Sequence, residues 1–289
     1  MPARERYFCS LESQKNGEDI FATVARIRSW FLLEYPGAWR RNAIEDNRLL
    51  SPAVRDHMRR WERTILIRQQ YRRDPGEVRA FVVDSSPESP SMSGYRITDY
   101  EQVRQIIGSG EPVPGLMFAV CTHGRHDLCC AKFGHPVWCA LRELAPDRAW
   151  QCSHIGGDRF AANVMVLPHG IFYGRVRPED LPELLRASGA GQIWMPGYRG
   201  RSCYGRAIQT AEYFLRKESG CFGFNDFTPL TGPHTTGDRT TVVFEARADG
   251  SRRRVEYSTM KSGWQQRLTC SAPEESRVAQ HRLVSYTVE

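Results

Sequence analysis

Residues that can bind a metal or carry out redox chemistry are concentrated in one stretch, residues 115–175, where they fall into two groups. In chain order, the groups comprise Cys121, His123, His126, Cys129 and Cys130, followed by Cys152, His154 and Asp158. The first group follows the segment LMFAV and the second begins at the end of RAWQC, and both segments have the length of a buried β-strand. This stretch is therefore where we expect the functional site.

The elements around these groups predict an α/β fold with a thioredoxin-like arrangement. The strand at LMFAV is followed by a helix over 136–144, a strand at RAWQCS, a hairpin of ANVMVLP and IFYGRV, and a helix that Pro178 begins. On a sheet with this order, the loops after the first and second strands are neighbours at one end. The two groups of candidate ligands should therefore meet.

The rest of the sequence predicts two flanking parts. We expect an N-terminal α/β lobe, a thioredoxin-like domain and a C-terminal β appendage, with the boundaries 1–110, 111–220 and 221–289. In the appendage, two alternating segments around Asp249-Gly250 predict a β-hairpin, and RLTC and HRLVSYTV are candidates for two more strands.

The N-terminal lobe should begin with a loosely ordered lead-in over residues 1–14, in which Cys9 would be an inert surface thiol. Apolar spacing predicts a helix over 19–27, and a helix over 49–61 should be capped by Ser51. The segments SWFLLE, TILIRQ and VRAFVVDS are typical of strands.

The cysteine content favours a reducing compartment. The chain has 289 residues and nine cysteines, an odd number, and its first residues lack the apolar core of a secretory signal. No apolar run approaches the roughly 20 residues of a membrane-spanning helix. We therefore expect a cytoplasmic protein that uses its cysteines for metal or redox chemistry.

The net charge of +7 comes from an excess of arginine, in runs such as Arg252-Arg253-Arg254. These runs lack interleaved aromatic residues and match no nucleic-acid motif, so we do not expect nucleic-acid binding. A basic surface suits an acidic protein partner that is attracted by long-range charge.

Three kinds of site are compatible with the two groups. A dithiol site is disfavoured because the sequence has no CxxC motif and adjacent cysteines bridge only with strain. Cys121, Cys130, His154 and a fourth ligand could hold zinc. An iron–sulfur cluster is the third interpretation, with Cys121 and Cys130 in a C-x8-C spacing and His154 and Asp158 separated by three residues.

The motifs CTHGRHDLCCA, HIGGDRFAANVMVLPHGIFYGRV and YRGRSCYGRAIQTAE, together with FLLEYPGAW and RLTCSAPE, resemble the sucrase/ferredoxin-like family, a branch of the thioredoxin-like ferredoxins. The resemblance extends over most of the chain. It implies a thioredoxin-like ferredoxin domain with a 2Fe–2S cluster, held by two cysteines of the first loop and two histidines of an HxGGH motif. Cys121, Cys130 and His154 match three of these positions, and Asp158 stands where the family has its second histidine.

This departure leaves the fourth ligand open. Asp158 can bind through oxygen, and its harder, charged carboxylate predicts a lower reduction potential and a more labile cluster. Cys129, His126 and Cys152 are alternatives, and a site without a cluster is another.

Further residues of the same motifs suggest supporting roles. We interpret His123 and Arg125 as donors of hydrogen bonds to the cluster or its ligands. Arg159, Arg199 and Arg201 could form a basic rim suited to an acidic electron donor.

We therefore expect an electron-transfer or redox-sensing protein that works with a redox protein partner, and no substrate turnover by this chain alone. Two alternatives are a zinc-stabilised or metal-free binding protein that has lost the cluster, and a thiol-dependent reductase that uses Cys129 or Cys130 as its nucleophile.

Overall fold

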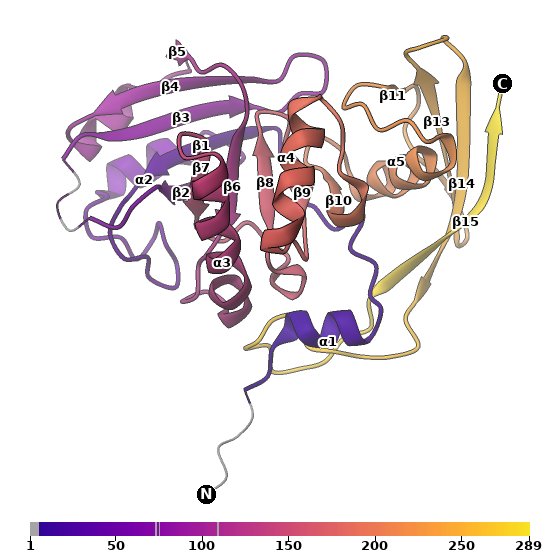
Figure 1. The fold of residues 1–289 in the computed structure, drawn as a ribbon, viewed down its shortest axis with the longest axis horizontal. Coiled ribbons are helices and arrows are strands. Elements are labelled where there is room, and N and C mark those ends of the chain that lie inside the picture. Colours follow the sequence, from indigo (N-terminus) through magenta and orange to yellow (C-terminus); the bar gives the residue numbers. More distant parts are fainter. Residues whose placement is uncertain (1–5, 73, 75, 109) are drawn as a thin grey trace, which may run out of the picture.

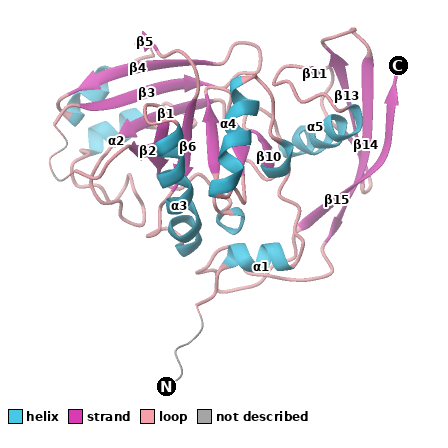
Figure 2. Cartoon of the chain, viewed as in Figure 1, coloured by secondary structure: helices cyan, strands magenta, loops and turns pink. Residues whose placement is uncertain are grey.

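A large mixed β-sheet runs through most of the computed structural model, which describes residues 6–72, 74, 76–108 and 110–289 (Figures 1 and 2). Its strands among these residues are β1 (Ser29–Glu34), β2 (Arg63–Arg68), β3 (Val78–Asp84), β4 (Ser91–Ile97), β5 (Glu111–Pro112), β6 (Met117–Cys121), β7 (Ala149–Cys152), β8 (Val164–Leu167), β9 (Ile171–Tyr173) and β10 (Tyr198–Arg201). Their order across the sheet is β10-β9-β8-β6-β7-β2-β1-β3-β4-β5. The predicted α/β class is confirmed.

Strands β6 to β9 form the thioredoxin-like unit. Strand β6 pairs in parallel with β7, β8 pairs antiparallel with β6, and β9 pairs antiparallel with β8. Helix α3 (Leu128–Leu144) connects β6 to β7, and α4 (Leu181–Gly189) follows β9. Cys121 and Cys152 are partners at the carboxyl ends of β6 and β7, so the two loops leave the same end of the sheet. The predicted order of elements is confirmed.

Helix α3 begins at Leu128 rather than at residue 136. Asp127 caps it, because its side chain accepts the backbone N–H of Cys129 at 2.8 Å. Pro136, a residue type that often marks the start of a helix, lies inside α3 instead. As a result, Cys129 and Cys130 lie in the first turn of a helix and not in a loop.

The N-terminal segment extends the same sheet. Strand β2 pairs antiparallel with β7, and β1 lies between β2 and β3. Residues 29–97 and 117–201 therefore contribute to one continuous sheet. The three-part division of the chain by residue number stays a prediction.

Helix α1 (Cys9–Lys15) lies where a loosely ordered lead-in was expected, so that prediction is wrong. The helix packs on the 3-10 helix η2 (Asp158–Phe160), next to which the hydroxyl of Ser10 donates to the carbonyl oxygen of Ala161 at 2.9 Å. Cys9 is fully buried and is not a surface thiol.

The helix predicted over residues 19–27 is absent, and these residues are irregular. The side chain of Gln209 accepts the backbone N–H of Val24 at 3.3 Å and donates to its carbonyl oxygen at 3.0 Å. These are the groups that a helix would bond internally, so the contact with a distant side chain replaces the local structure.

Most other predicted N-terminal elements are present. Helix α2 (Pro52–Met58) is capped by Ser51, whose hydroxyl accepts the backbone N–H of Val54 at 3.3 Å. The three segments expected as strands form β1, β2 and β3. The 3-10 helix η1 (Tyr100–Gln105) follows β4.

A smaller sheet follows towards the C-terminus. Its described strands are β11 (Phe227–Pro229), β12 (His234–Thr236), β13 (Arg239–Ala246), β14 (Arg252–Lys261) and β15 (Ala279–Val288). Strands β13 and β14 form the predicted hairpin, β15 contains HRLVSYTV, and α5 (Arg206–Ser219) packs against them (Figure 1). The RLTC segment is irregular rather than a strand, and its part of the chain runs beside α1 (Figure 1).

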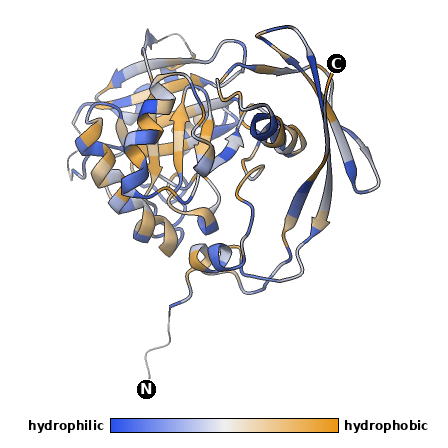
Figure 3. Cartoon of the chain, turned by 45° about the vertical axis from the view of Figure 1, so that its right-hand side comes forward, coloured by the Kyte–Doolittle hydropathy of each residue, from blue (hydrophilic) through white to orange (hydrophobic). Residues whose placement is uncertain are grey.

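Apolar residues gather in the central strands of the large sheet and on the helices that cover it (Figure 3). Two more 3-10 helices, η3 (Pro178–Asp180) and η4 (Met195–Gly197), lie on either side of α4 in the sequence. Within the described ranges, no helix is both long and apolar enough to cross a membrane.

Replacing Gly134 with alanine should separate α3 from β6. A methyl group at Gly134 would overlap the carbonyl oxygen of Cys121, which is backbone and cannot turn aside. We expect the Gly134→Ala variant to lose about 1–3 kcal/mol of unfolding free energy, measured by urea denaturation.

The matched control is Gly189→Ala, at the exposed end of α4, where an added methyl group meets nothing within 4 Å. This variant should be unchanged or more stable by up to about 1 kcal/mol. Equal stability of the two variants would contradict the close approach of α3 to β6.

Candidate metal centre

The two cysteines of the C-x8-C spacing meet at the end of β6. Cys121 is the last residue of β6, and Cys130 lies in the first turn of α3, which packs against β6 through Gly134. Both cysteines are about 1% exposed. The two sulfur atoms and one ring nitrogen of His154 all lie within 4.8 Å of one another. The structure thus brings three of the predicted ligands together.

Asp158 joins this group through the turn that follows His154. Gly156 and Gly157 adopt φ of +87° and +81°, and this left-handed turn brings the chain back towards the site. Oδ1 of Asp158 lies 3.0 Å from Nδ1 of His154 and accepts a hydrogen bond from Sγ of Cys130 at 3.2 Å. Asp158 therefore lies between the cysteine side and the histidine side of the site.

Two further histidines support the second loop. The ring of His126 stacks on that of His154, with centroids 3.7 Å apart. Nδ1 of His123 accepts the backbone N–H of His154 at 3.2 Å, while its Nε2 donates to the carbonyl oxygen of Arg40 at 2.7 Å. His123 thus holds the backbone of a candidate ligand, whereas Arg125 is exposed at the surface of the first loop.

The buried groups of the site shift one another's pKa. Hydrogen bonds from the Cys130 and Cys152 thiols hold the pKa of Cys121 well below its ordinary value, against the effect of burial. The bond to Cys121 and burial raise the pKa of Cys130. Burial opposes the charged form of His154, but Asp158 and Cys121 outweigh it and raise the pKa of His154 to about 9. These shifts favour the charged forms of both Cys121 and His154, which attract each other.

The alternative fourth ligands are placed differently. His126 lies with His154 and Asp158 at the edge of the site, and Cys152 is buried next to Cys121 in the paired strand. Cys129 points away and belongs to a second group of side chains, with Cys9. Asp158 and His126 are therefore the alternatives best placed to complete the site.

The predicted basic rim is wrong for two of its three arginines. Arg199 and Arg201 are each about 1% exposed. Arg199 donates to Oδ1 of Asn163 at 2.8 Å and to the carbonyl oxygen of Gly156 at 3.1 Å. The Arg199 side chain thus stabilises the glycine turn. Arg159 is partly exposed and paired with Glu18 at 2.7 Å.

A small hollow of about 230 Å³ borders the histidine side of the site, and sequence reasoning missed it. Its lining includes His126, His154 and the exposed residues Arg41 and Arg63. Arg63 donates to the carbonyl oxygen of His154 at 3.1 Å. These arginines come from the N-terminal segment, so only the fold could reveal that they lie here.

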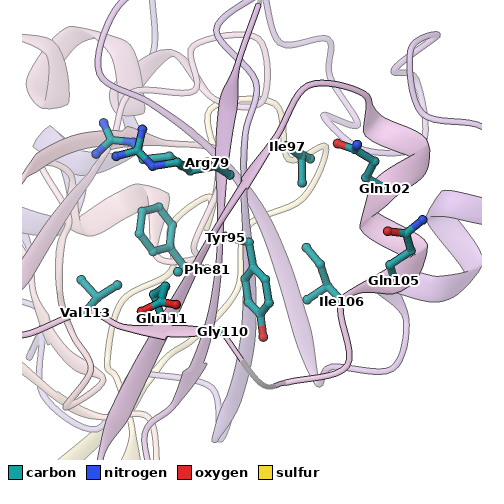
Figure 4. Close-up of a pocket in the computed structure, with 12 residues that line it drawn as sticks. Arg79, Phe81, Tyr95, Ile97, Gln102, Gln105, Ile106, Gly110, Glu111 and Val113 are labelled. Atoms are coloured by element: carbon teal, nitrogen blue, oxygen red, sulfur yellow. The ribbon is translucent and has the colours of Figure 1, made fainter.

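A larger hollow of about 900 Å³ lies elsewhere, over β3 and β4 (Figure 4). Phe81, Tyr95, Ile106 and Glu111 are among its lining residues (Figure 4). No cysteine or histidine is found among the described residues that line it. It is therefore separate from the candidate metal centre.

Comparisons with known proteins match this part of the chain. The profile of the family described as Sucrase/ferredoxin-like matches residues 20–200. Altered inheritance of mitochondria protein 32 from Meyerozyma guilliermondii is 25% identical over 135 residues, which cover 42% of this chain and 48% of that protein. The chain thus spans about half the length of this curated relative.

Two solved structures are also similar in part. They are cysteine-to-serine variants of the thioredoxin-like 2Fe–2S ferredoxin from Aquifex aeolicus, 21% and 20% identical to this chain. Each match covers 29% of this chain and 97% of the ferredoxin, with a TM-score of 0.26.

Replacing Arg199 with glutamine should loosen the glycine turn. The change leaves the Asn163 side chain and the Gly156 carbonyl oxygen without their buried donor. We expect a loss of about 2–4 kcal/mol in unfolding free energy and faster amide hydrogen exchange in residues 154–158. The control Arg186→Gln, on the exposed face of α4, should change stability by less than about 0.5 kcal/mol. Unchanged exchange in residues 154–158 would contradict this role.

Proposed function

The chain belongs to the sucrase/ferredoxin-like family, and on this premise we propose that Cys121, Cys130, His154 and Asp158 hold a 2Fe–2S cluster and that the protein transfers electrons. One observation carries the proposal. Two thiols, an imidazole and a carboxylate from two separate loops converge on one buried site.

The chemistry of these donors fits the group. Thiolates are the usual ligands of iron–sulfur clusters, and imidazoles replace two of them in centres of the Rieske type. Nδ1 of His154 is buried and lies 3.0 Å from Oδ1 of Asp158, so these two proposed ligands face each other across the site. Asp158 is about 4% exposed, and a buried carboxylate of this kind requires a cation or several hydrogen-bond donors.

When bound, a 2Fe–2S cluster accepts and returns a single electron. The residues of the chain govern access to it. The cysteine side is buried beneath α3, so water and oxidants are excluded from Cys121 and Cys130. The histidine side is less buried, with the His154 side chain 19% exposed next to the hollow. Electrons would therefore enter and leave by way of His154.

The surface around His154 supports an acidic redox partner. Arg40, Arg41 and Arg63 are exposed near this side of the site. An acidic protein attracted by these charges would bind with His154 at the centre of the contact. We propose that this surface attracts the acidic partner, in place of the buried Arg199 and Arg201 that the sequence had suggested.

The reductase alternative has less support. A nucleophilic cysteine needs an exposed, low-pKa thiol. Cys129 and Cys130 are both buried, the bond to Cys270 raises the pKa of Cys129 to about 12, and the bond to Cys121 raises that of Cys130.

Iron and sulfide analysis of protein purified without oxygen tests the proposal. We expect about two irons and two sulfides per chain, with a visible charge-transfer absorption that bleaches on reduction. Cys121→Ser and Cys130→Ser should each remove this absorption, because each takes away a thiolate ligand.

The matched control is Cys139→Ser, on the same helix α3, where the thiol lies only 3.5 Å from His135 and away from the site. This variant should retain full absorption. Protein that contains no iron, or absorption that survives in both Cys121→Ser and Cys130→Ser, would overturn the proposal. Zinc bound in place of iron at Cys121 would support the zinc-stabilised alternative.

Changes at Asp158 test the fourth ligand. Asp158→His restores the family's ligand set and replaces a charged ligand by a neutral one, so the reduction potential should rise by on the order of 100 mV. Asp158→Ala should shift the visible spectrum and make the cluster more labile. The control Asp147→His, at an exposed position before β7, should leave both properties unchanged. An unchanged spectrum in Asp158→Ala would exclude Asp158 as a ligand and point to His126.

A further inference from the structure

A second group of cysteines assembles outside the proposed cluster site. Cys9 of α1, Cys129 of α3 and Cys270 of the irregular segment after β14 bring their sulfur atoms together. The Sγ distances are 3.7 Å from Cys9 to Cys129, 3.3 Å from Cys129 to Cys270, and 3.7 Å from Cys270 to Cys9. Cys9 and Cys129 are fully buried, and Cys270 is partly buried.

The carboxylate of Asp127 lies beside the triangle. Its two oxygens are 3.9 and 4.0 Å from Sγ of Cys9. The same carboxylate accepts the backbone N–H of Cys129 at 2.8 Å and that of Cys270 at 2.7 Å, so its position is fixed by two of the three cysteines. Asp127 is about 3% exposed.

We propose that Cys9, Cys129 and Cys270, together with Asp127, form a structural zinc site. Structural zinc is bound tetrahedrally by four protein ligands, most often cysteine and histidine but also carboxylate. A Zn–S bond of about 2.3 Å in a tetrahedron places two sulfur ligands about 3.8 Å apart. The three observed distances, 3.3 to 3.7 Å, need only a small expansion to admit the ion.

Charge also favours a cation here. Among the described residues, no lysine or arginine forms an ion pair with Asp127, although its carboxylate is buried. A divalent ion would compensate the carboxylate and the thiolates together.

A disulfide explains the group less well. A bond between any two of the sulfurs would leave a third thiol next to it without a partner, and Asp127 would gain no counter-ion. Zinc uses all four groups. It is also redox-inert, which suits a position one residue away from the proposed cluster ligand Cys130.

The zinc site would link three parts of the chain that are far apart in the sequence. Cys9 lies 120 residues from Cys129 and 261 residues from Cys270. Figure 1 shows α1 beside the segment between β14 and β15, at a lower position in the view than α3. Cys9 and Cys270 lie outside residues 20–200, the part that matches the family profile, whereas Asp127 and Cys129 lie inside it. The zinc would hold α1 and the segment after β14 against the first turn of α3.

Zinc analysis of the full chain, purified with a reductant and dialysed, tests the proposal. We expect about one tightly bound zinc per chain, and X-ray absorption at the zinc edge should show three sulfur ligands and one oxygen ligand. Cys9→Ser and Cys270→Ser should each lose the zinc. Cys121→Ser, which removes a proposed iron ligand, and Cys221→Ser, which removes an exposed thiol, should both retain it.

Determining iron and zinc in the same sample distinguishes the proposed zinc site from the proposed cluster site. Cobalt added alone to metal-free protein should give a thiolate-to-cobalt absorption that Cys270→Ser abolishes and Cys121→Ser preserves. Removing zinc with a chelator should lower the melting temperature and speed proteolysis at α1.

Three outcomes would overturn the proposal. They are wild-type protein that binds neither zinc nor cobalt through these cysteines, zinc that depends on Cys121 but not on Cys270, and a Cys129–Cys270 disulfide found by peptide mapping of freshly purified protein. Should the serine variants fail to fold, the ligand count from X-ray absorption on the wild-type protein decides alone.

Discussion

The contact between Gly134 and the backbone of Cys121 determines how the candidate site forms. The missing side chain lets α3 approach the end of β6 so closely that an added methyl group would overlap a carbonyl oxygen. This approach brings the first turn of α3, with Cys130, over the last residue of β6. The second loop then reaches the same place, because β7 runs parallel to β6 and ends next to it. The position of Cys130 over Cys121 depends on this close approach.

The adjacent cysteines of α3, Cys129 and Cys130, face different groups of side chains. Successive residues of an α-helix point about 100° apart, so Cys130 faces Cys121 while Cys129 faces Cys9. From the sequence, Cys130 was an expected ligand and Cys129 was an alternative fourth ligand of the same site. In the structure, a single helical turn contributes one thiol to each of two groups, and Asp127 caps the turn. Any movement of this turn would therefore displace one thiol in each of the two groups.

The sequence could predict those parts of the protein whose structure is set locally. The thioredoxin-like order of elements, the cap at Ser51 and the hairpin of β13 and β14 all follow from periodicity and turn chemistry. The approach of Cys121, Cys130 and His154 followed from the order of the strands. Residues 19–27 could not be predicted, because a side chain 185 residues away occupies the backbone groups of Val24. The burial of Cys9 and Arg199 likewise depends on contacts that no local pattern records.

The separation of the ligands along the chain sets the order in which the two groups can assemble. The proposed cluster ligands all lie between residues 121 and 158, so they are all present once the thioredoxin-like unit has been synthesised. The triangle of thiols, in contrast, must wait for Cys270, which lies 261 residues after Cys9. Domains generally fold as units during synthesis, starting from the N-terminal side. A nascent chain could thus receive the proposed cluster while Cys9 is still without its last partner, and closure of the triangle would mark the end of maturation.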